Sequence, residues 1–490
     1  MPLHTEIEFE RDICQHLAAH GWQYAEPGAE GDARGWDTPR ALYPPDLLAW
    51  LQASQAQAWA QLSKLHGAAA EAVVLERLRK ALDEQGTLAV LRHGVELVGL
   101  KAPLKLAQFK PALAMNAELQ ARYAANRLRV LRQVRTNHDD IIDLVLCLNG
   151  VPVATAELKT DFTQDVNRAI DQYRFERMPR PKGRAQAEPL LDFPRGALVH
   201  FAVSNRTVFM TTRLLGPATR FLPFNQGDGG GAGNPPNGQG HRTAYLWEQV
   251  WQRDSWLEII GRYLVARRNA KKQVEAVLFP RYHQLDATRK LVQAVLAEGP
   301  GHRYLIQHSA GSGKTNSIAW TAHFLSELHD AQDRKVFSSV LVVSDRNVLD
   351  AQLQEAIYDF QRTTGVVASI TGNDASKSQQ LARALSGDKK IVVCTIQTFP
   401  FALAAVRELA ATQGKRFAVI ADEAHSSQTG EAASKLKQVL SSEEQQALAD
   451  GGEVSNEDIL AAHMAALRST SVSSHSCAPV ASRNAMRYGV

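Results

Sequence analysis

The sequence has few cysteines and no pattern that would organise them. Only Cys14, Cys147, Cys394 and Cys477 occur in 490 residues, and none of them belongs to a CxxC pair. This scatter argues against a zinc site and against a disulfide framework. A reducing compartment, the cytoplasm, is therefore expected.

Long apolar runs are missing as well. No uninterrupted apolar stretch reaches the roughly 20 residues that a membrane helix needs, and the acidic start MPLHTEIEFE has no signal-peptide features. We therefore expect a soluble protein with no membrane segment. An excess of one charge is also absent, because the formal net charge is only +4. Nucleic-acid binding is thus permitted but would depend on local basic patches.

A chain of 490 residues is too long for one hydrophobic core and should form two or three domains. Short apolar strands among helices predict an α/β domain over residues 1–225. The sequence QGDGGGAGNPPNGQG and the tryptophans after it predict a linker with a docking helix over 226–260. Alternating strands and helices predict a parallel α/β lobe over 261–468. The Ser-rich residues 469–490 are predicted to be disordered.

A phosphate-binding loop is predicted within residues 304–315. An apolar strand there runs into a glycine-rich turn and then into a helix. The glycines Gly311 and Gly313 let backbone N–H groups approach phosphate oxygens. Lys314 offers a positive charge to the β and γ phosphates, and Thr315 offers a hydroxyl to Mg²⁺.

A second motif, about a hundred residues downstream, supports this interpretation. Residues 416–425 form an apolar strand that ends in Asp-Glu-Ala-His, and we expect it to neighbour the phosphate-loop strand in the same sheet. Asp422 can hold Mg²⁺, and Glu423 can activate the attacking water. The stricter phosphate-loop pattern has glycine where His308 stands, but both motifs occur in order at strand ends.

Together these motifs resemble superfamily 2 helicases and translocases. The resemblance implies that Gln284 reads adenine through its amide. The residues expected to bind ATP are Gln284, Gly311, Ser312, Gly313, Lys314, Thr315 and Asp422, the last two also contacting the metal. Possible DNA contacts, for which ordinary surface positions are the alternative, are Asp345, Arg346, Gln352, Thr395 and Gln397.

A nuclease site is predicted on the hairpin of residues 143–159. Asp143 lies on its first strand, and Glu157 and Lys159 share one face of the second because side chains alternate along a strand. The two carboxylates and the Leu158 carbonyl can bind Mg²⁺, while Lys159 orients or polarises the attacking water. The alternative is a set of charges at a solvated strand end.

The register of the hairpin decides whether this site can exist. A two-residue Asn149-Gly150 turn would place Asp143 opposite Ala156 and away from Glu157. We therefore predict a three-residue loop with a left-handed Gly150, or an equivalent bulge.

The order of these motifs is similar to that of the R subunit of Type I restriction–modification enzymes, whose hairpin also carries an Asn-Gly-x-Pro turn, here Asn149–Pro152. The resemblance implies a restriction-endonuclease-like domain followed by a RecA-like lobe, with ATP and Mg²⁺ as cofactors. It also implies duplex DNA, a methyltransferase (M) subunit and a specificity (S) subunit as partners. Cleavage would be coupled to ATP-driven translocation.

The resemblance also bears on residues around the hairpin. Gln172 matches a glutamine of the family's nuclease centre, but Glu176 stands where the family has tyrosine, with Tyr173 nearby. The basic residues Arg127, Arg129, Arg132 and Arg135 have two open interpretations, phosphate contacts or a solvated face.

The family continues into a second motor lobe, whose next motif should follow MAALRS near residue 468. The Ser-rich segment that stands there leads us to expect an interrupted chain, with a frameshift as the hypothesis. Two alternatives to a restriction subunit remain: a repair-type helicase with an accessory nuclease domain, and a fragment that only binds DNA or partners. The sequence does not determine the DNA recognition sequence, the stoichiometry of the complex or the preferred metal.

Overall fold

The computed structural model describes most of the first two thirds of the chain and parts of the remainder. The described residues are 6–25, 35–344 with gaps at 112, 114, 162–164, 182, 184–185 and 310, then 347–360, 366–369, 380, 383–385, 387, 389–395, 415–422 and 485–488. The chain divides into two compact units, with the boundary in the sequence between residues 283 and 284.

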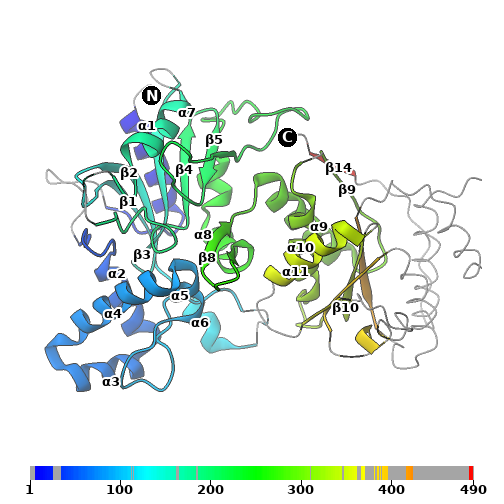
Figure 1. The fold of residues 1–490 in the computed structure, drawn as a ribbon, viewed down its shortest axis with the longest axis horizontal. Coiled ribbons are helices and arrows are strands. Elements are labelled where there is room, and N and C mark those ends of the chain that lie inside the picture. Colours follow the sequence, from blue (N-terminus) through cyan, green and yellow to red (C-terminus); the bar gives the residue numbers. More distant parts are fainter. Residues whose placement is uncertain are drawn as a thin grey trace, which may run out of the picture. The chain divides into compact units, whose positions relative to one another are not determined.

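The first unit has a six-stranded sheet flanked by helices (Figure 1). The helices before the sheet are α1 (Glu6–Ala19), α2 (Pro44–Ser54), α3 (Ala56–His66), the 3₁₀ turn η1 (Gly67–Ala69), α4 (Ala70–Gln85), α5 (Thr87–His93) and α6 (Ala117–Ala125). The strands, in sheet order, are β1 (Leu128–Arg135), β2 (Ile141–Leu148), β3 (Val151–Lys159), β4 (Val199–Ser204), β5 (Val208–Thr211) and β6 (Leu222–Pro223).

Strands β3 and β4 are parallel, whereas the other neighbouring strands are antiparallel. The crossover from β3 to β4 contains α7 (Val166–Asp171) and the π-helical segment η2 (Gln172–Glu176). This mixed sheet with flanking helices confirms the predicted fold class for the first part of the chain.

Residues after the glycine-rich segment also belong to the first unit. They form η3 (Leu246–Val250), α8 (Arg253–Glu258), η4 (Ile259–Tyr263) and the hairpin β7 (Val265–Arg268)–β8 (Val274–Leu278). Trp251 and Trp256 are fully buried and contact Phe201 of β4. Where one docking helix is predicted, the structure has three short helical segments. Tryptophan side chains of this region pack on the sheet of the first unit.

The glycine-rich segment is anchored by one asparagine. The buried Asn234 side chain donates hydrogen bonds to the Arg206 carbonyl and to Asn225 Oδ1, and accepts one from the Gln226 N–H. The predicted role of a flexible linker therefore differs from the structure here, because a buried polar side chain ties the segment to the domain.

The β2–β3 hairpin contains the bulge that the site requires. Asn149 and Gly150 form a two-residue turn with φ values of 49° and 78°, and Leu148 pairs with Val151. The register then shifts between Leu146 and Cys147, so that Leu144 pairs with Ala156. One step further along, Asp143 lies opposite Glu157. The prediction of a bulge is confirmed, although a three-residue loop is not used.

The second unit contains a parallel sheet of the predicted α/β class. Its elements are α9 (Tyr282–Glu298), β9 (Leu305–His308), α10 (Lys314–Ser326), β10 (Ser339–Ser344), α11 (Asn347–Asp359), β11 (Val367–Ser369), β12 (Ile391–Thr395), β13 (Phe417–Ala421) and β14 (Ala485–Tyr488). The sheet order is β11-β12-β10-β13, and α10 packs against the sheet.

Two details of the second unit differ from expectation. The phosphate-loop strand β9 pairs in parallel with β14, not with β13, in the described part of the chain. Of the Ser-rich tail, the structure describes only Ala485–Tyr488, which form β14, and the predicted disorder of residues 469–490 stays a prediction. The positions of the predicted domain boundaries stay a prediction. Among the described residues, no helix is long and apolar enough to cross a membrane.

The turn glycine Gly150 provides a test of the hairpin geometry. A Cβ at this position would lie 2.3 Å from the Tyr43 carbonyl oxygen, whereas a Cβ at Gly21, also at positive φ, meets nothing within 4 Å. Gly150→Ala should therefore lower the free energy of unfolding of the first unit by about 1–3 kcal/mol more than Gly21→Ala. Urea unfolding followed by tryptophan fluorescence measures this difference. Equal losses in the two variants would contradict the described packing of the turn.

Candidate functional site

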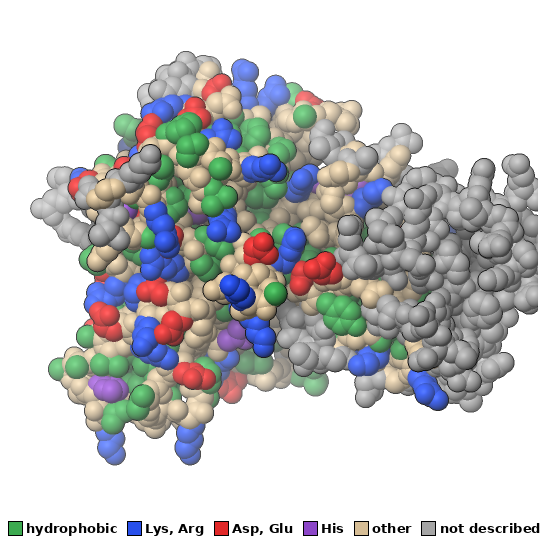
Figure 2. Space-filling view, viewed as in Figure 1, with side chains coloured by type: hydrophobic (Ala, Val, Ile, Leu, Met, Phe, Trp, Pro, Cys, Tyr) green, Lys and Arg blue, Asp and Glu red, His purple; other side chains and the backbone are tan. Residues whose placement is uncertain are grey.

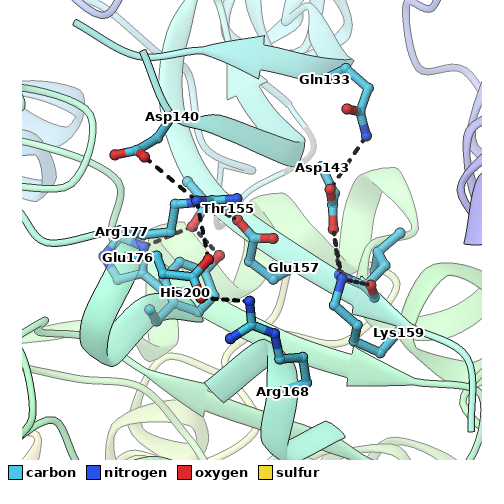
Figure 3. Close-up of polar contacts among 12 residues, drawn as sticks. Gln133, Asp140, Asp143, Thr155, Glu157, Lys159, Arg168, Glu176, Arg177 and His200 are labelled. Atoms are coloured by element: carbon cyan, nitrogen blue, oxygen red, sulfur yellow. Dashed lines mark hydrogen bonds and ion pairs between the residues drawn. The ribbon is translucent and has the colours of Figure 1, made fainter. Parts of the chain in front are cut away.

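Asp143 and Lys159 point toward each other at the open end of the bulged hairpin (Figure 3), and both contact the backbone of Leu158. Asp143 Oδ2 accepts a hydrogen bond of 2.8 Å from the Leu158 N–H. Lys159 Nζ lies 4.0 Å from the same oxygen and donates to the Leu158 carbonyl at 2.7 Å. The structure thus brings together the acid, the lysine and the carbonyl that the sequence singles out, all of them buried.

Glu157 lies opposite Asp143 and is 0% exposed. Its Oε1 accepts a 3.1 Å hydrogen bond from Arg177 Nε, while its Oε2 is buried without a hydrogen-bond partner among the described residues. Burial raises the pKa of Glu157 well above its ordinary value, and the negative charge of Asp143 raises it further. Arg177 and Lys159 oppose this rise.

Helix α1 adds two acids that sequence reasoning missed. Carboxylate oxygens of Glu6, Glu10 and Asp143 all lie within 4.8 Å of one another. Glu6 Oε1 accepts a 2.5 Å hydrogen bond from Lys159 Nζ, and Glu10 Oε2 accepts one of 2.9 Å from Arg132 Nε. Burial, then the charge of Asp143, raises the pKa of Glu10 to about 7.

A sequence signal for Glu10 did exist. Glu10 is buried on the same face of α1 as Phe9, Ile13, Cys14 and Leu17. An acid that falls in the apolar set of an amphipathic helix needs a partner in the interior. Its spacing of four residues from Glu6 also places both acids on one side of the helix.

Gln133 connects the helix to the hairpin. Its side-chain amide donates to Glu10 Oε1 at 2.8 Å and to Asp143 Oδ1 at 3.3 Å. Its backbone has a φ of 52°, which is uncommon for a residue with a side chain and costs about 1–3 kcal/mol. This conformation lets the consecutive residues Arg132 and Gln133 both reach Glu10, which regular alternation along a strand would prevent.

The donor set fits a small divalent cation. Asp143, Glu157, the Leu158 carbonyl and the two acids of α1 offer only oxygen atoms, which are the ligands that Mg²⁺ prefers. Glu157 Oε2 is buried and has no hydrogen-bond partner among the described residues, which is costly for a carboxylate oxygen. A bound cation would supply the missing partner. The residues present therefore fit a metal ion beside Asp143, where the carboxylates of Glu6, Glu10 and Asp143 approach one another.

A neutral polar network lies beside the charged cluster. Thr155 Oγ1 is 2.7 Å from the Tyr173 hydroxyl and 2.8 Å from His200 Nδ1. Complete burial lowers the pKa of His200 to about 3. Tyr173 is thus part of the core beside β3 and is hydrogen-bonded to Thr155. Glu176, in the place of the family's tyrosine, contacts Arg168 and Arg177.

The basic residues of β1 and the residue before it are engaged in internal ion pairs. Arg127 and Arg129 both bind Asp46, and Arg132 binds Glu10. A solvated face does not describe Arg129 and Arg132, whose side chains are mostly buried in these pairs, whereas phosphate contacts stay a prediction. Arg135 is exposed and pairs with Asp139. On the face that Figure 2 shows, basic and acidic side chains are interspersed over the first unit.

The phosphate loop has the backbone that its glycines predict. Gly311 and Gly313 have φ values of 75° and 82°, and α10 begins at Lys314. The buried Gln284 donates from Nε2 to the carbonyls of Ser312 and Gly313, at 3.3 and 3.0 Å. Gln284 thus braces the loop, and its contact with adenine stays a prediction.

The other predicted residues of the second unit are only partly described. Asp422 follows β13, and its N–H donates to the Val343 carbonyl of β10 at 2.9 Å. Glu423, Asp345, Arg346 and Gln397 lie outside the described residues, as do the side chains of Gln352 and Thr395. Their roles stay predictions, as does that of Thr315.

Comparison with known proteins assigns a family model to each part of the chain. Residues 4–218 match the model described as "Type I restriction enzyme R protein N terminus", and residues 283–449 match "SWI2/SNF2 ATPase". Among solved structures, the UvsW helicase from bacteriophage T4 is similar at 18% identity and a TM-score of 0.24. That match covers 37% of this chain and 54% of the UvsW chain, so this chain spans about half of the neighbour's length. The search of curated proteins returned no match.

The buried His200 predicts a pH dependence of stability. Its pKa falls from 6.5 to about 3 on folding, so between these values the unfolded chain binds a proton that the folded chain excludes. The free energy of unfolding is therefore highest, as far as His200 determines it, above pH 6.5. Below this pH it falls by up to about 1.4 kcal/mol per pH unit. His200→Gln should flatten this part of the profile, whereas Tyr173→Phe should keep its slope. Urea unfolding between pH 7 and pH 5 tests it, and identical slopes for the wild type and His200→Gln would contradict it.

Proposed function

We propose that this chain, a type I R-subunit-like protein, hydrolyses phosphodiester bonds of duplex DNA with Mg²⁺ at the β2–β3 hairpin. The observation that carries the proposal is the bulge in β3, which brings Asp143 and Glu157 onto one face beside Lys159. An accidental group of surface charges would be solvated, but these side chains are buried. Buried charges without a function are costly and therefore rare.

Asp143, Glu157 and the Leu158 carbonyl would hold the metal ion, with Glu10 and Glu6 close enough to Asp143 to share it. When bound, Mg²⁺ supplies Lewis-acid polarisation of the scissile phosphate. Lys159 Nζ stands between the Leu158 carbonyl and Asp143, where it orients the attacking water and stabilises negative charge on the phosphate. Gln133 keeps Asp143 and Glu10 together by donating to both.

In the second unit, the match to an ATPase family implies ATP as a cofactor. We infer that Lys314 and the N-terminus of α10 receive the terminal phosphates, in a loop that Gln284 braces. Asp422, at the end of β13, would contribute to Mg²⁺ binding, and Glu423 would activate water. In full-length members of the family, which have a second motor lobe, ATP hydrolysis would drive DNA translocation together with methyltransferase and specificity subunits.

Lys159→Ala tests the nuclease site. In a reconstituted complex with the methyltransferase and specificity subunits, this variant should lose at least about 100-fold in Mg²⁺-dependent cleavage, because the attacking water is no longer positioned. DNA-stimulated ATP hydrolysis should stay within about twofold of the wild type, since it takes place in the other unit. Lys80→Ala, at a mostly exposed surface lysine of α4, is the matched control. Undiminished cleavage by Lys159→Ala would exclude this hairpin as the nuclease site.

Lys314→Ala tests the nucleotide site. Loss of the ammonium group should lower the ATPase rate by at least about 100-fold, and cleavage in the complex should fall with it. Lys290→Ala, at a surface lysine of α9, serves as the control. If Lys314→Ala loses ATPase activity but cleaves DNA at the wild-type rate, then coupling of the two activities is wrong.

A further inference from the structure

The buried Glu157 carboxylate depends on a cation that the nuclease motif does not contain. Lys159 Nζ, the cation of the motif, is hydrogen-bonded to Glu6 and to the Leu158 carbonyl. The hydrogen bond to Glu157 comes instead from Arg177, at 3.1 Å, and the Arg177 side chain is itself only 13% exposed. A carboxylate this deeply buried has lost its contacts with water, and the charge-assisted hydrogen bond from Arg177 satisfies one of its two oxygens.

Arg177 is held in place from several sides (Figure 3). Its backbone N–H donates to the Gln172 carbonyl at 2.7 Å, which closes the π-helical segment η2. Its Nη1 lies 3.6 Å from Asp140 Oδ1 and 3.8 Å from Glu176 Oε2. Glu176 is bound in turn to Arg168 at 2.6 Å. These contacts fix the Arg177 guanidinium relative to β3. Glu176, which stands where the family has tyrosine, is one of the residues that hold it.

The contact engages only one of the two Glu157 oxygens. Arg177 Nε binds Oε1, and Oε2 is left buried with no hydrogen-bond partner among the described residues. A guanidinium whose only purpose was to neutralise the acid could form a bidentate pair, with two parallel hydrogen bonds. The single contact therefore leaves Glu157 Oε2 available, on the strand that pairs with the strand of Asp143.

We propose that Arg177 is a positioning residue of the nuclease site, which holds Glu157 by Oε1 so that Oε2 is presented to the metal ion beside Asp143. This inference rests on the proposed nuclease function and adds a residue outside the Asp/Glu-x-Lys motif. Groups that orient metal ligands through hydrogen bonds commonly affect metal affinity by about 10–100-fold. Arg177 should act on metal affinity in the same way, without touching the metal or the DNA.

The test measures Mn²⁺ binding to the full chain without nucleotide, by titration calorimetry. Arg177→Ala should weaken the Mn²⁺ site that is sensitive to Asp143→Asn by about tenfold or more, and Arg177→Lys by less, because it keeps the charge. Arg174→Ala is the matched control, an arginine of the same crossover that binds the Thr219 carbonyl and Asp171 instead of Glu157, and it should change affinity by less than about twofold. Thermal unfolding of each variant checks folding.

A double-mutant cycle separates positioning from general stabilisation. If Arg177 acts through Glu157, Arg177→Ala should have no further effect on Mn²⁺ affinity in a Glu157→Gln background. Additive effects would overturn the proposal, as would wild-type or tighter binding by Arg177→Ala. Should Arg177→Ala fail to fold, the cycle is run with Arg177→Lys under the same criteria.

The same titrations distinguish the two proposals. Mn²⁺ binding that is insensitive to Asp143→Asn would refute the metal site, and the role of Arg177 with it. Binding that is lost in Asp143→Asn but unchanged in Arg177→Ala would refute only the role of Arg177.

Discussion

The register of the β2–β3 hairpin is the constraint on which the candidate nuclease site depends. Val153 is an extra residue in β3, so Asp143 lies opposite Glu157 and not opposite Ala156. Pro152 has no N–H to give to a regular ladder, which is why proline is tolerated next to a bulge. The turn itself is anchored, because the buried Asn149 side chain donates to the Leu106 carbonyl and to Asn126 Oδ1. The hairpin therefore cannot slip by one residue without breaking buried hydrogen bonds.

Carboxylates that lie close together repel one another, and cationic side chains from the surrounding elements offset this repulsion. Glu6, Glu10, Asp143 and Glu157 come from a helix and two strands, and their cationic partners are Lys159, Arg132 and Arg177. Each cation also has another hydrogen bond or ion pair, which fixes its position. The ion pairs are not sources of stability in themselves, because desolvation offsets much of their attraction. Their consequence is that the carboxylate oxygens are held in fixed positions, as the proposed metal site requires.

The sequence predicts the bulged register of the hairpin better than the contacts around it. Alternation along a strand places Glu157 and Lys159 on one face, and the register argument correctly requires a bulge. The same reasoning could not supply Glu6 and Glu10, because their approach to Asp143 depends on how α1 packs on the sheet. Arg177 was equally hidden, since its contact with Glu157 follows from the π-helical geometry of η2. The internal ion pairs of Arg129 and Arg132 could not be predicted either, because Asp46 and Glu10 lie far from these arginines in the sequence. In the second unit, the turn at Gly311 and Gly313 follows from local sequence, whereas the pairing of β9 with β14 joins segments far apart in the chain.

The position of a bound metal ion tests the central claim most directly. A crystal structure of the chain with Mn²⁺, with the ion located by its anomalous scattering, would show which oxygens it contacts. The account predicts an ion bound by Asp143, by Glu157 Oε2 and by the Leu158 carbonyl, at roughly 2.1 Å as for Mg²⁺. An ion that binds elsewhere, or a Glu157 carboxylate that takes no part in its coordination, would contradict it.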